Sequence, residues 1–192
     1  LGKLLFSDSL RYNQMKPNKE MENNQFQFHL DQLTEMDLVK KEGSKYLLTN
    51  KGKEYANRID ESETKLKLQA KISAWVCCVR KFMDKRQFLI YTRLKQPFYG
   101  CQGYLSGKVR YGEMLTEAVK RELKEETNMN CKDSKLVAIK HYRVFDKKTR
   151  DLVEDKFMFL CLVEEPQGKL TGNQEGRFEW VDESKLYDYV MN

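Results

Sequence analysis

The sequence lacks the features that build secreted and membrane-spanning proteins. No apolar run approaches the roughly 20 residues that a transmembrane helix needs. The first residues show no basic segment followed by an apolar one, as a signal peptide would. Five cysteines form an odd set without a C-x-x-C pair, which disfavours both a disulfide framework and a zinc site. These absences predict a cytoplasmic protein that has no membrane partner.

Proline and histidine are also scarce. The three prolines interrupt no candidate helix, and neither His29 nor His141 has a nucleophile or metal ligand nearby in sequence. Histidine-based catalysis is therefore not expected. Hydrophobic residues still make up 40% of the 192 residues, which is enough for a packed core. The length allows one large domain or two small ones.

Basic side chains exceed acidic ones, and the excess is unevenly distributed. The net charge is +6, but the first 70 residues carry 12 basic and 11 acidic side chains, so the rest of the chain holds almost all of the excess. A positive surface of this kind can bind nucleic acid or attract a small anionic substrate. The sequence alone leaves both interpretations open.

Residues 1–60 have the pattern of short helices followed by a hairpin. One helix is expected at Leu4–Phe6 and a second at Ser9–Asn13, where Ser7 or Ser9 would cap it. A third helix would bury Phe26, Leu30 and Leu33, which recur at helical spacing. A hairpin then turns at Gly43, and Thr49 caps a last helix that contains Gly52.

This order resembles the winged helix-turn-helix family, and LVKKEGSKYLLTNKGKEY is similar to its wing and following helix. The resemblance implies a small α+β domain over residues 1–60 that binds DNA through the third helix. The polar side chains available there to read base edges are Asn23, Asn24, Gln25, Gln27 and His29. The helix has no Arg or Lys to contact phosphates, so a dimerisation module or a folded prefix is the alternative.

Residues 61–70 are charged and poor in core residues until Leu66, which predicts a linker. The remaining residues 71–192 have the pattern of an α/β domain. Strands are expected at 72–79, 87–92, 137–144, 157–163 and 178–181, with a strong helix at 114–127 and a final helix at 183–189.

Three glutamates lie on the wrong side of the strong helix. On a helical wheel Glu122, Glu125 and Glu126 continue the apolar stripe that begins at Leu115. Unpaired buried carboxylates are costly and repel one another. Either the helix end is solvated, or cations hold the cluster, and oxygen ligands of this kind suit Mg²⁺ or Mn²⁺.

The segment around this helix, GKVRYGEMLTEAVKRELKEETNM, resembles the Nudix box G-x5-E-x7-R-E-U-x-E-E-x-G-U, where U is apolar. Every fixed position matches except that Asn128 stands where the family has Gly. Asn is the next best residue for a left-handed helix end, so the change is mild. The resemblance implies the Nudix fold, an α/β/α sandwich about a mixed sheet, and hydrolysis of a nucleoside diphosphate linked to another group.

The same resemblance implies roles for individual residues. Glu122, Glu125 and Glu126 would bind the metal, and Glu122 would also act as base towards water. Arg121 would orient a helix carboxylate, and Glu113 would tie the loop to the helix. The candidates outside the helix are the Ser106 carbonyl and Glu175 as further metal ligands, Gly107 as the point where the loop passes close, and Lys108 and Arg93 as phosphate contacts.

The base-binding residues are not evident from the sequence. Candidates for stacking on a base are Phe98, Tyr99, Tyr104, Tyr111 and Trp180, all of which can equally be core residues.

Three functions are therefore open. The first is a Mg²⁺-dependent pyrophosphohydrolase with a nucleotide substrate. The second is a nucleotide-sensing transcriptional regulator that binds DNA through the winged helix. The third is a binding module with a decayed site, an interpretation that only Asn128 and Ser106 favour. A homodimer is compatible with each of them.

Overall fold

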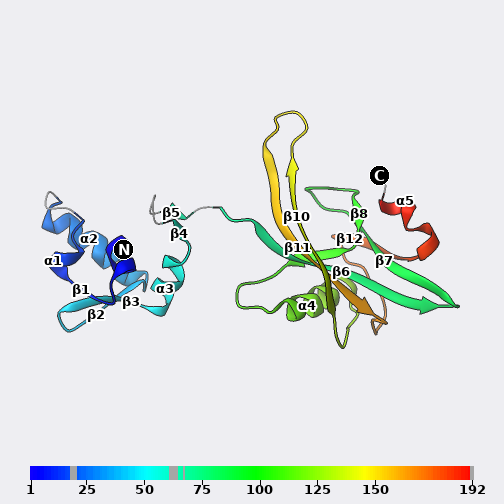
Figure 1. The fold of residues 1–192 in the computed structure, drawn as a ribbon, viewed down its shortest axis with the longest axis horizontal. Coiled ribbons are helices and arrows are strands. Elements are labelled where there is room, and N and C mark those ends of the chain that lie inside the picture. The colour runs from blue at the N-terminus through cyan, green and yellow to red at the C-terminus, as the bar shows by residue number, and fades with distance from the viewer. Residues whose placement is uncertain (18–20, 61–64, 67, 191–192) are drawn as a thin grey trace. The chain divides into compact units, whose positions relative to one another are not determined.

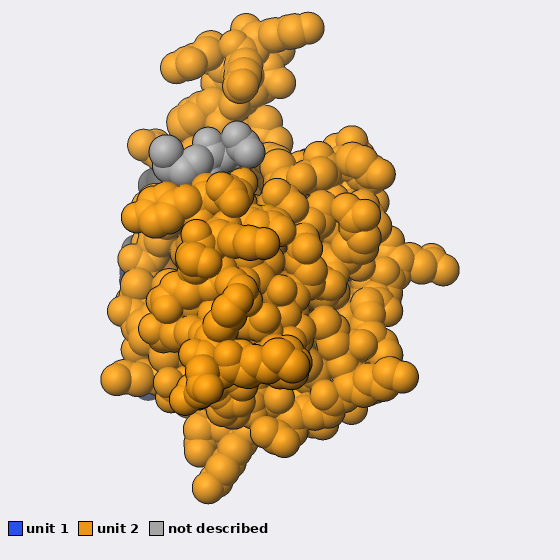
Figure 2. Space-filling model, turned by 90° about the vertical axis from the view of Figure 1, so that its right-hand side faces the viewer, with its two compact units in different colours: residues 1–68 blue, residues 69–192 orange. Residues whose placement is uncertain are grey.

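The computed structural model describes residues 1–17, 21–60, 65–66 and 68–190. The chain divides into two compact units, Leu1–Leu68 and Gln69–Asn192. Figure 1 shows the elements of both units, and Figure 2 shows the surface of the second. Of the predicted linker, residues 61–64 and 67 lie outside the described residues. On either side of the first gap, β4 (Ile59–Asp60) pairs with β5 (Lys65–Leu66).

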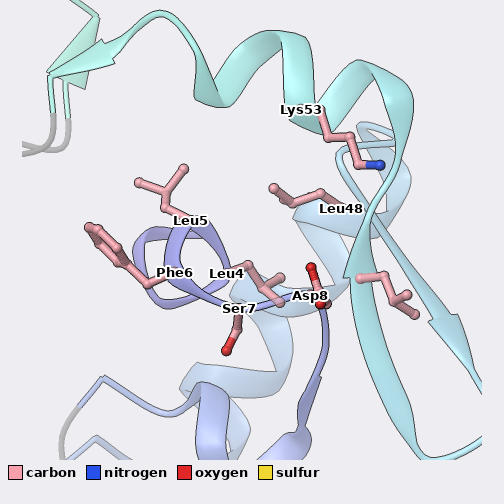
Figure 3. A pocket seen from close by; sticks show the side chains of 8 residues that line it. Leu4, Leu5, Phe6, Ser7, Asp8, Leu48 and Lys53 are labelled. Carbon is pink, nitrogen blue, oxygen red and sulfur yellow. The ribbon is translucent and has the colours of Figure 1, made fainter.

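The N-terminal unit combines short helices with a three-stranded sheet. Its elements are the 3₁₀ helix η1 (Gly2–Phe6), β1 (Leu10–Arg11), α1 (Tyr12–Met15), α2 (Asn23–Glu35), β2 (Val39–Glu42), β3 (Lys45–Leu48) and α3 (Asn50–Ala56). The strand order is β1-β3-β2, and the buried side chains Leu4, Phe26 and Leu30 form its core. A shallow cavity of about 580 Å³ lies between η1, β3 and α3, lined by Leu4, Phe6 and Lys53 among others (Figure 3).

Two sequence predictions in this unit have different outcomes. The Thr49 cap is confirmed, because its hydroxyl accepts a hydrogen bond from the Gly52 amide at 2.9 Å. The helix at Ser9–Asn13 is wrong at its start. Leu10 and Arg11 form a strand that pairs with Tyr46 and Lys45, so the helix begins only at Tyr12. Neither Ser7 nor Ser9 caps it, since its N-cap residue is Arg11.

The C-terminal unit is built on a mixed seven-stranded sheet. Its main strands are β6 (Lys71–Phe82), β7 (Lys85–Arg93), β10 (Lys135–Phe145), β11 (Leu152–Glu164) and β12 (Gly176–Asp182). They lie in the order β10-β11-β6-β7-β12, with β8 (Gln102–Gly103) on β7 and β9 (Leu105–Lys108) on β6. The β11–β6 pair is parallel and every other pair is antiparallel.

Successive residues of β6 face opposite sides of this sheet, and each side is covered by helix. Val76 and Cys78 pack with Leu123 of α4 (Leu115–Thr127) on one side. Cys77 and Val79 pack on the other side with Leu186, which lies between the 3₁₀ helix η2 (Glu183–Lys185) and α5 (Tyr187–Val190). The expected α/β sandwich about a mixed sheet is therefore confirmed. The single final helix expected at 183–189 is wrong, because the segment is divided between η2 and α5.

β10 and β11 form a hairpin that projects from the rest of the sheet (Figure 1). Lys156 is the first β11 residue with a β6 partner, whereas the pairing with β10 extends beyond it to Phe145 and Leu152. β10 is an edge strand, since β11 is its only neighbour among the strands of the described residues. No helix among the described residues is long and apolar enough to cross a membrane.

Candidate functional site

Arg121 of α4 and Glu113 form a bidentate ion pair that joins the helix to the loop before it. The Nε–Oε1 distance is 2.6 Å and the Nη2–Oε2 distance is 2.9 Å. Both side chains are nearly buried. Hydrogen bonding from Arg121, helped by the Arg110 amide, lowers the pKa of Glu113 to about 2. Glu113 is thus ionised at neutral pH and ties the loop to the helix.

The Arg121 guanidinium has three further partners. Its Nη1 lies 2.6 Å from Glu122 Oε1 and 3.1 Å from Glu125 Oε2. Its Nη2 donates to the Lys108 carbonyl at 2.9 Å. The hydrogen bonds that Arg121 donates to Glu113 first, and to Glu122 and Glu125, raise its pKa. One fixed cation therefore offsets the repulsion among three carboxylates.

The Glu122 carboxylate occupies space that a side chain at position 107 would fill. A Cβ added to Gly107 would lie 1.8 Å from Glu122 Cδ. Only 9% of Glu122 is exposed, and burial raises its pKa, against the opposing effect of Arg121. Gly107 in β9 is therefore needed because the carboxylate passes directly beside it. β9 itself was missed in the sequence, since LSGK has no apolar periodicity.

Glu125 and Glu126 are more accessible than Glu122. The Glu125 side chain is 47% exposed and lies 3.2 Å from Arg110 Nη2. Glu126 is half-buried and accepts a hydrogen bond from Asn173 Nδ2 at 2.6 Å. The wheel placed all three glutamates on the covered stripe, and this holds fully only for Glu122.

Two residues that the sequence reading missed, Arg110 and Asn173, contact these carboxylates. Arg110 lies inside the Nudix box, three residues before Glu113, and this position could have identified it. Asn173 lies in the loop with Glu175, and its Oδ1 accepts a hydrogen bond from the Glu175 amide at 2.8 Å. The Glu175 side chain pairs instead with Lys95, at an Nζ–Oε1 distance of 2.5 Å. The loop of Glu175 is nevertheless connected to Glu126 through Asn173.

The donors suit Mg²⁺ or Mn²⁺ in chemistry, because all are oxygen atoms: the carboxylates of Glu122, Glu125 and Glu126 and the carbonyl of Ser106. In the structure these carboxylates bind Arg121, Arg110 and Asn173. Among residues 1–17, 21–60, 65–66 and 68–190, no group of three or more His, Cys, Asp or Glu side chains is gathered closely enough to hold a metal ion.

A cavity of about 790 Å³ lies over the sheet beside Gly107. It brings together Ser106, Gly107, Lys108 and Arg93, which the sequence analysis selected separately. Arg93 is oriented by the loop that follows it, since its Nε donates to the Pro97 carbonyl at 2.7 Å. A cavity of this size is typical of a small-molecule site, and its lining is largely polar and basic.

Only some of the proposed stacking residues lie in this cavity. Phe98 and Tyr104 line it, whereas Tyr99, Tyr111 and Trp180 do not. Trp180 packs partly buried on the core, with the Arg80 guanidinium 4.2 Å above its ring. The sequence analysis missed three aromatic residues of the lining, Trp75, Tyr91 and Tyr142. Successive side chains of a strand point to opposite faces of the sheet. This alternation identifies the three residues only when it is known which face of the sheet carries the cavity.

In the N-terminal unit, the five polar residues selected for DNA contact are exposed at the start of α2. Gln27 Nε2 donates to Asp31 at 2.7 Å, and Asn23 Oδ1 accepts from Lys16 Nζ at 2.9 Å. His29 Nδ1 lies 3.3 Å from Gln32 Oε1. The remaining two, Asn24 and Gln25, extend from the same turn of the helix.

The NUDIX domain family model matches residues 72–190, and the chain belongs to this family. Among solved structures, the NUDIX domain of Shewanella oneidensis NrtR, complexed with ADP ribose, is 15% identical with a TM-score of 0.52 and covers 74% of this chain and 88% of its own. A MutT protein from Bacillus halodurans is 26% identical with a TM-score of 0.51, over 62% and 72% of the two chains. A MutT/nudix family protein from Enterococcus faecalis is 15% identical with a TM-score of 0.52, over 69% and 50%. The comparison with curated proteins gives no match.

Proposed function

We propose that the protein hydrolyses the pyrophosphate bond of a nucleoside diphosphate linked to another group, with Mg²⁺ or Mn²⁺ as cofactor. The observation that carries this proposal is the Glu122 carboxylate, which is buried against Gly107 and hydrogen-bonded to Arg121. A buried acid with a fixed cationic partner beside a basic cavity is typical of a reaction centre.

The metal would be held by Glu122, Glu125 and Glu126, with the Ser106 carbonyl and Glu175 as further candidates. A bound divalent ion would neutralise charge on the pyrophosphate and lower the pKa of an attached water molecule. The protein's own side chains supply the rest. Arg121 orients the carboxylates, Glu122 accepts the proton of the attacking water, and Lys108 and Arg93 attract the phosphate oxygens.

The proposal is tested by hydrolysis of nucleoside triphosphates, nucleotide sugars and dinucleotides in the presence of Mg²⁺. We expect Glu125→Gln and Glu126→Gln each to lower kcat/KM by about 10²-fold, which is typical for the loss of an electrostatic group at a reaction centre. Glu117→Gln is the matched control, since it makes the same change on the exposed side of α4. Wild-type rates in both site variants would refute the proposal.

We also propose that residues 1–60 form a winged helix-turn-helix domain that binds DNA through α2. Two observations support this: the strand order β1-β3-β2 beside the helices α1, α2 and α3, and the exposed polar residues on α2. With the Nudix domain as nucleotide sensor, such a chain would be a transcriptional regulator. Retention of genomic DNA fragments by the full chain, weakened by Asn24→Ala with Gln27→Ala, tests it. Retention that does not respond to these substitutions would refute a role of α2.

A further inference from the structure

The cavity floor carries two rows of side chains across four strands. The first row runs from Lys140 on β10 through Met158 on β11 and Ser73 on β6 to Lys108 on β9, which are direct partners in the sheet. Directly paired residues point to the same face, and all four line the cavity. The row therefore has a lysine at each end and no charge between them.

The second row consists of Tyr142, Lys156 and Lys71, again direct partners. Behind it lies Glu154, of which only 7% is exposed. Its Oε1 is 3.3 Å from Lys156 Nζ and 3.4 Å from Lys71 Nζ. A buried carboxylate shared between two ammonium groups fixes both and leaves a net positive charge on the cluster.

Lys140 has no carboxylate partner among the described residues, and neither has Lys108. The end of the floor formed by Lys140 and Lys156 is therefore cationic even after Glu154 is counted. This positive end belongs to the hairpin and not to α4.

The two lysines that end the first row start from opposite ends of the cavity floor. Adjacent strands are about 4.8 Å apart, so three spacings separate the Lys108 and Lys140 backbones by about 14 Å. Lys108 is adjacent to Gly107 and its carbonyl binds Arg121, so it marks the reaction end of the cavity. Lys140 marks the opposite end.

We propose that the substrate carries a phosphate monoester separate from its pyrophosphate, and that Lys140 and Lys156 bind this phosphate. The inference rests on the proposed function for the position of the pyrophosphate. A neutral sugar in the same place would leave Lys140 without an anionic partner and the net positive charge of this end uncompensated. A phosphate monoester supplies two negative charges and several acceptor oxygens at one point.

Calorimetry in the absence of divalent metal tests the inference with two pairs of probes. NADP⁺ and NAD⁺ differ by one phosphate monoester, as do coenzyme A and dephospho-coenzyme A. For the wild-type chain we expect the phosphorylated member of at least one pair to bind about tenfold more tightly, as one charge-assisted contact supplies. Raising the salt concentration should reduce this preference, because the contact is electrostatic.

Lys140→Met is the principal variant, because Lys140 is exposed and its loss leaves no buried charge behind. We expect it to reduce the preference to about twofold or less, and Lys140→Arg to restore it. Lys147→Met removes a lysine from the hairpin outside the cavity lining and is the matched control. Equal affinity within both pairs, including no binding by any of the four compounds, or a preference that Lys140→Met leaves unchanged, would overturn the inference.

Hydrolysis of the same compounds with Mg²⁺ separates this inference from the proposed function. Hydrolysis without preference for the phosphorylated member would leave the proposed function in place and contradict the phosphate subsite. A lysine-dependent binding preference without hydrolysis of any compound would support the subsite and contradict the pyrophosphohydrolase.

Discussion

Two clusters of charged side chains in the C-terminal unit, one at α4 and one at the hairpin, stabilise buried charge in opposite ways. At α4 one guanidinium serves three carboxylates, Glu113, Glu122 and Glu125. On the hairpin one carboxylate, Glu154, serves the ammonium groups of Lys71 and Lys156. The α4 cluster keeps a surplus of negative charge and the hairpin cluster a surplus of positive charge. A cation is therefore attracted to the first cluster and an anion to the second.

Removing the cation that the three carboxylates at α4 share should have the largest effect on stability. Arg121→Met leaves Glu113 and Glu122 nearly buried without their ionic partner. We expect the free energy of unfolding to fall by about 3–5 kcal/mol, as it does when one member of a buried ion pair is removed. Urea denaturation measures it. Arg110→Met, whose ion pair with Glu125 is exposed, is the control and should cost under about 1 kcal/mol.

Filling the space beside Glu122 should have the next largest effect. Gly107→Ala places a methyl group where Glu122 Cδ lies, and we expect a loss of about 3 kcal/mol through overpacking. Activity should fall with it, because the carboxylate must move. Combining it with Glu122→Ala should recover the stability but not the activity. If the double variant is as unstable as Gly107→Ala, Glu122 is not the group that Gly107 accommodates.

The pH dependence of stability sharpens the comparison. The pKa of Glu113 is about 2 in the folded protein, below its ordinary value of 4.5. The stabilisation by ionised Glu113 is therefore present above pH 4.5 and is lost as the pH falls from there towards 2. We expect Glu113→Gln to cost about 2 kcal/mol at pH 7 and clearly less at pH 3. Denaturation of both chains at the two pH values measures this, and a constant difference would contradict the assignment.

The smallest effect is expected at the link between Glu126 and the Glu175 loop. Asn173→Ala removes a donor from Glu126 at a half-buried position, and we expect a cost of about 1 kcal/mol in unfolding free energy. Gln167→Ala, which lies in the same segment between β11 and β12, is the comparison variant. A larger loss of unfolding free energy than that of Glu113→Gln would mean that the loop, and not the ion-pair cluster at α4, makes the larger contribution to stability here.

The sequence predicted the charged cluster at α4 better than the one at the hairpin. The box places Arg121 and Glu122 on one helix and Glu113 at a fixed spacing in the loop before it, so local geometry brings them together. Asn128 is left-handed with φ 59°, as expected of a residue that replaces Gly at a helix end. What the pattern did not give is the number of partners of Arg121, because Glu125 reaches it only through the side-chain conformation.

The charged cluster at the hairpin depends on contacts between residues that are far apart in sequence. Glu154 and Lys71 are separated by 83 residues and meet only through the parallel pairing of β11 with β6. The strand at Leu10–Arg11 was misread for the same reason, since its partner Tyr46 lies in a distant hairpin. Helical spacing and local motifs carry no information on such registers.

The position of Lys140 on an edge strand has a consequence for how this protein can change. β10 has one neighbouring strand, so its residues can be exchanged without disturbing a second ladder or the helix that holds the acids. Under the proposed function, selectivity for one nucleotide over another can thus change through substitutions in the hairpin while the carboxylates of α4 stay the same.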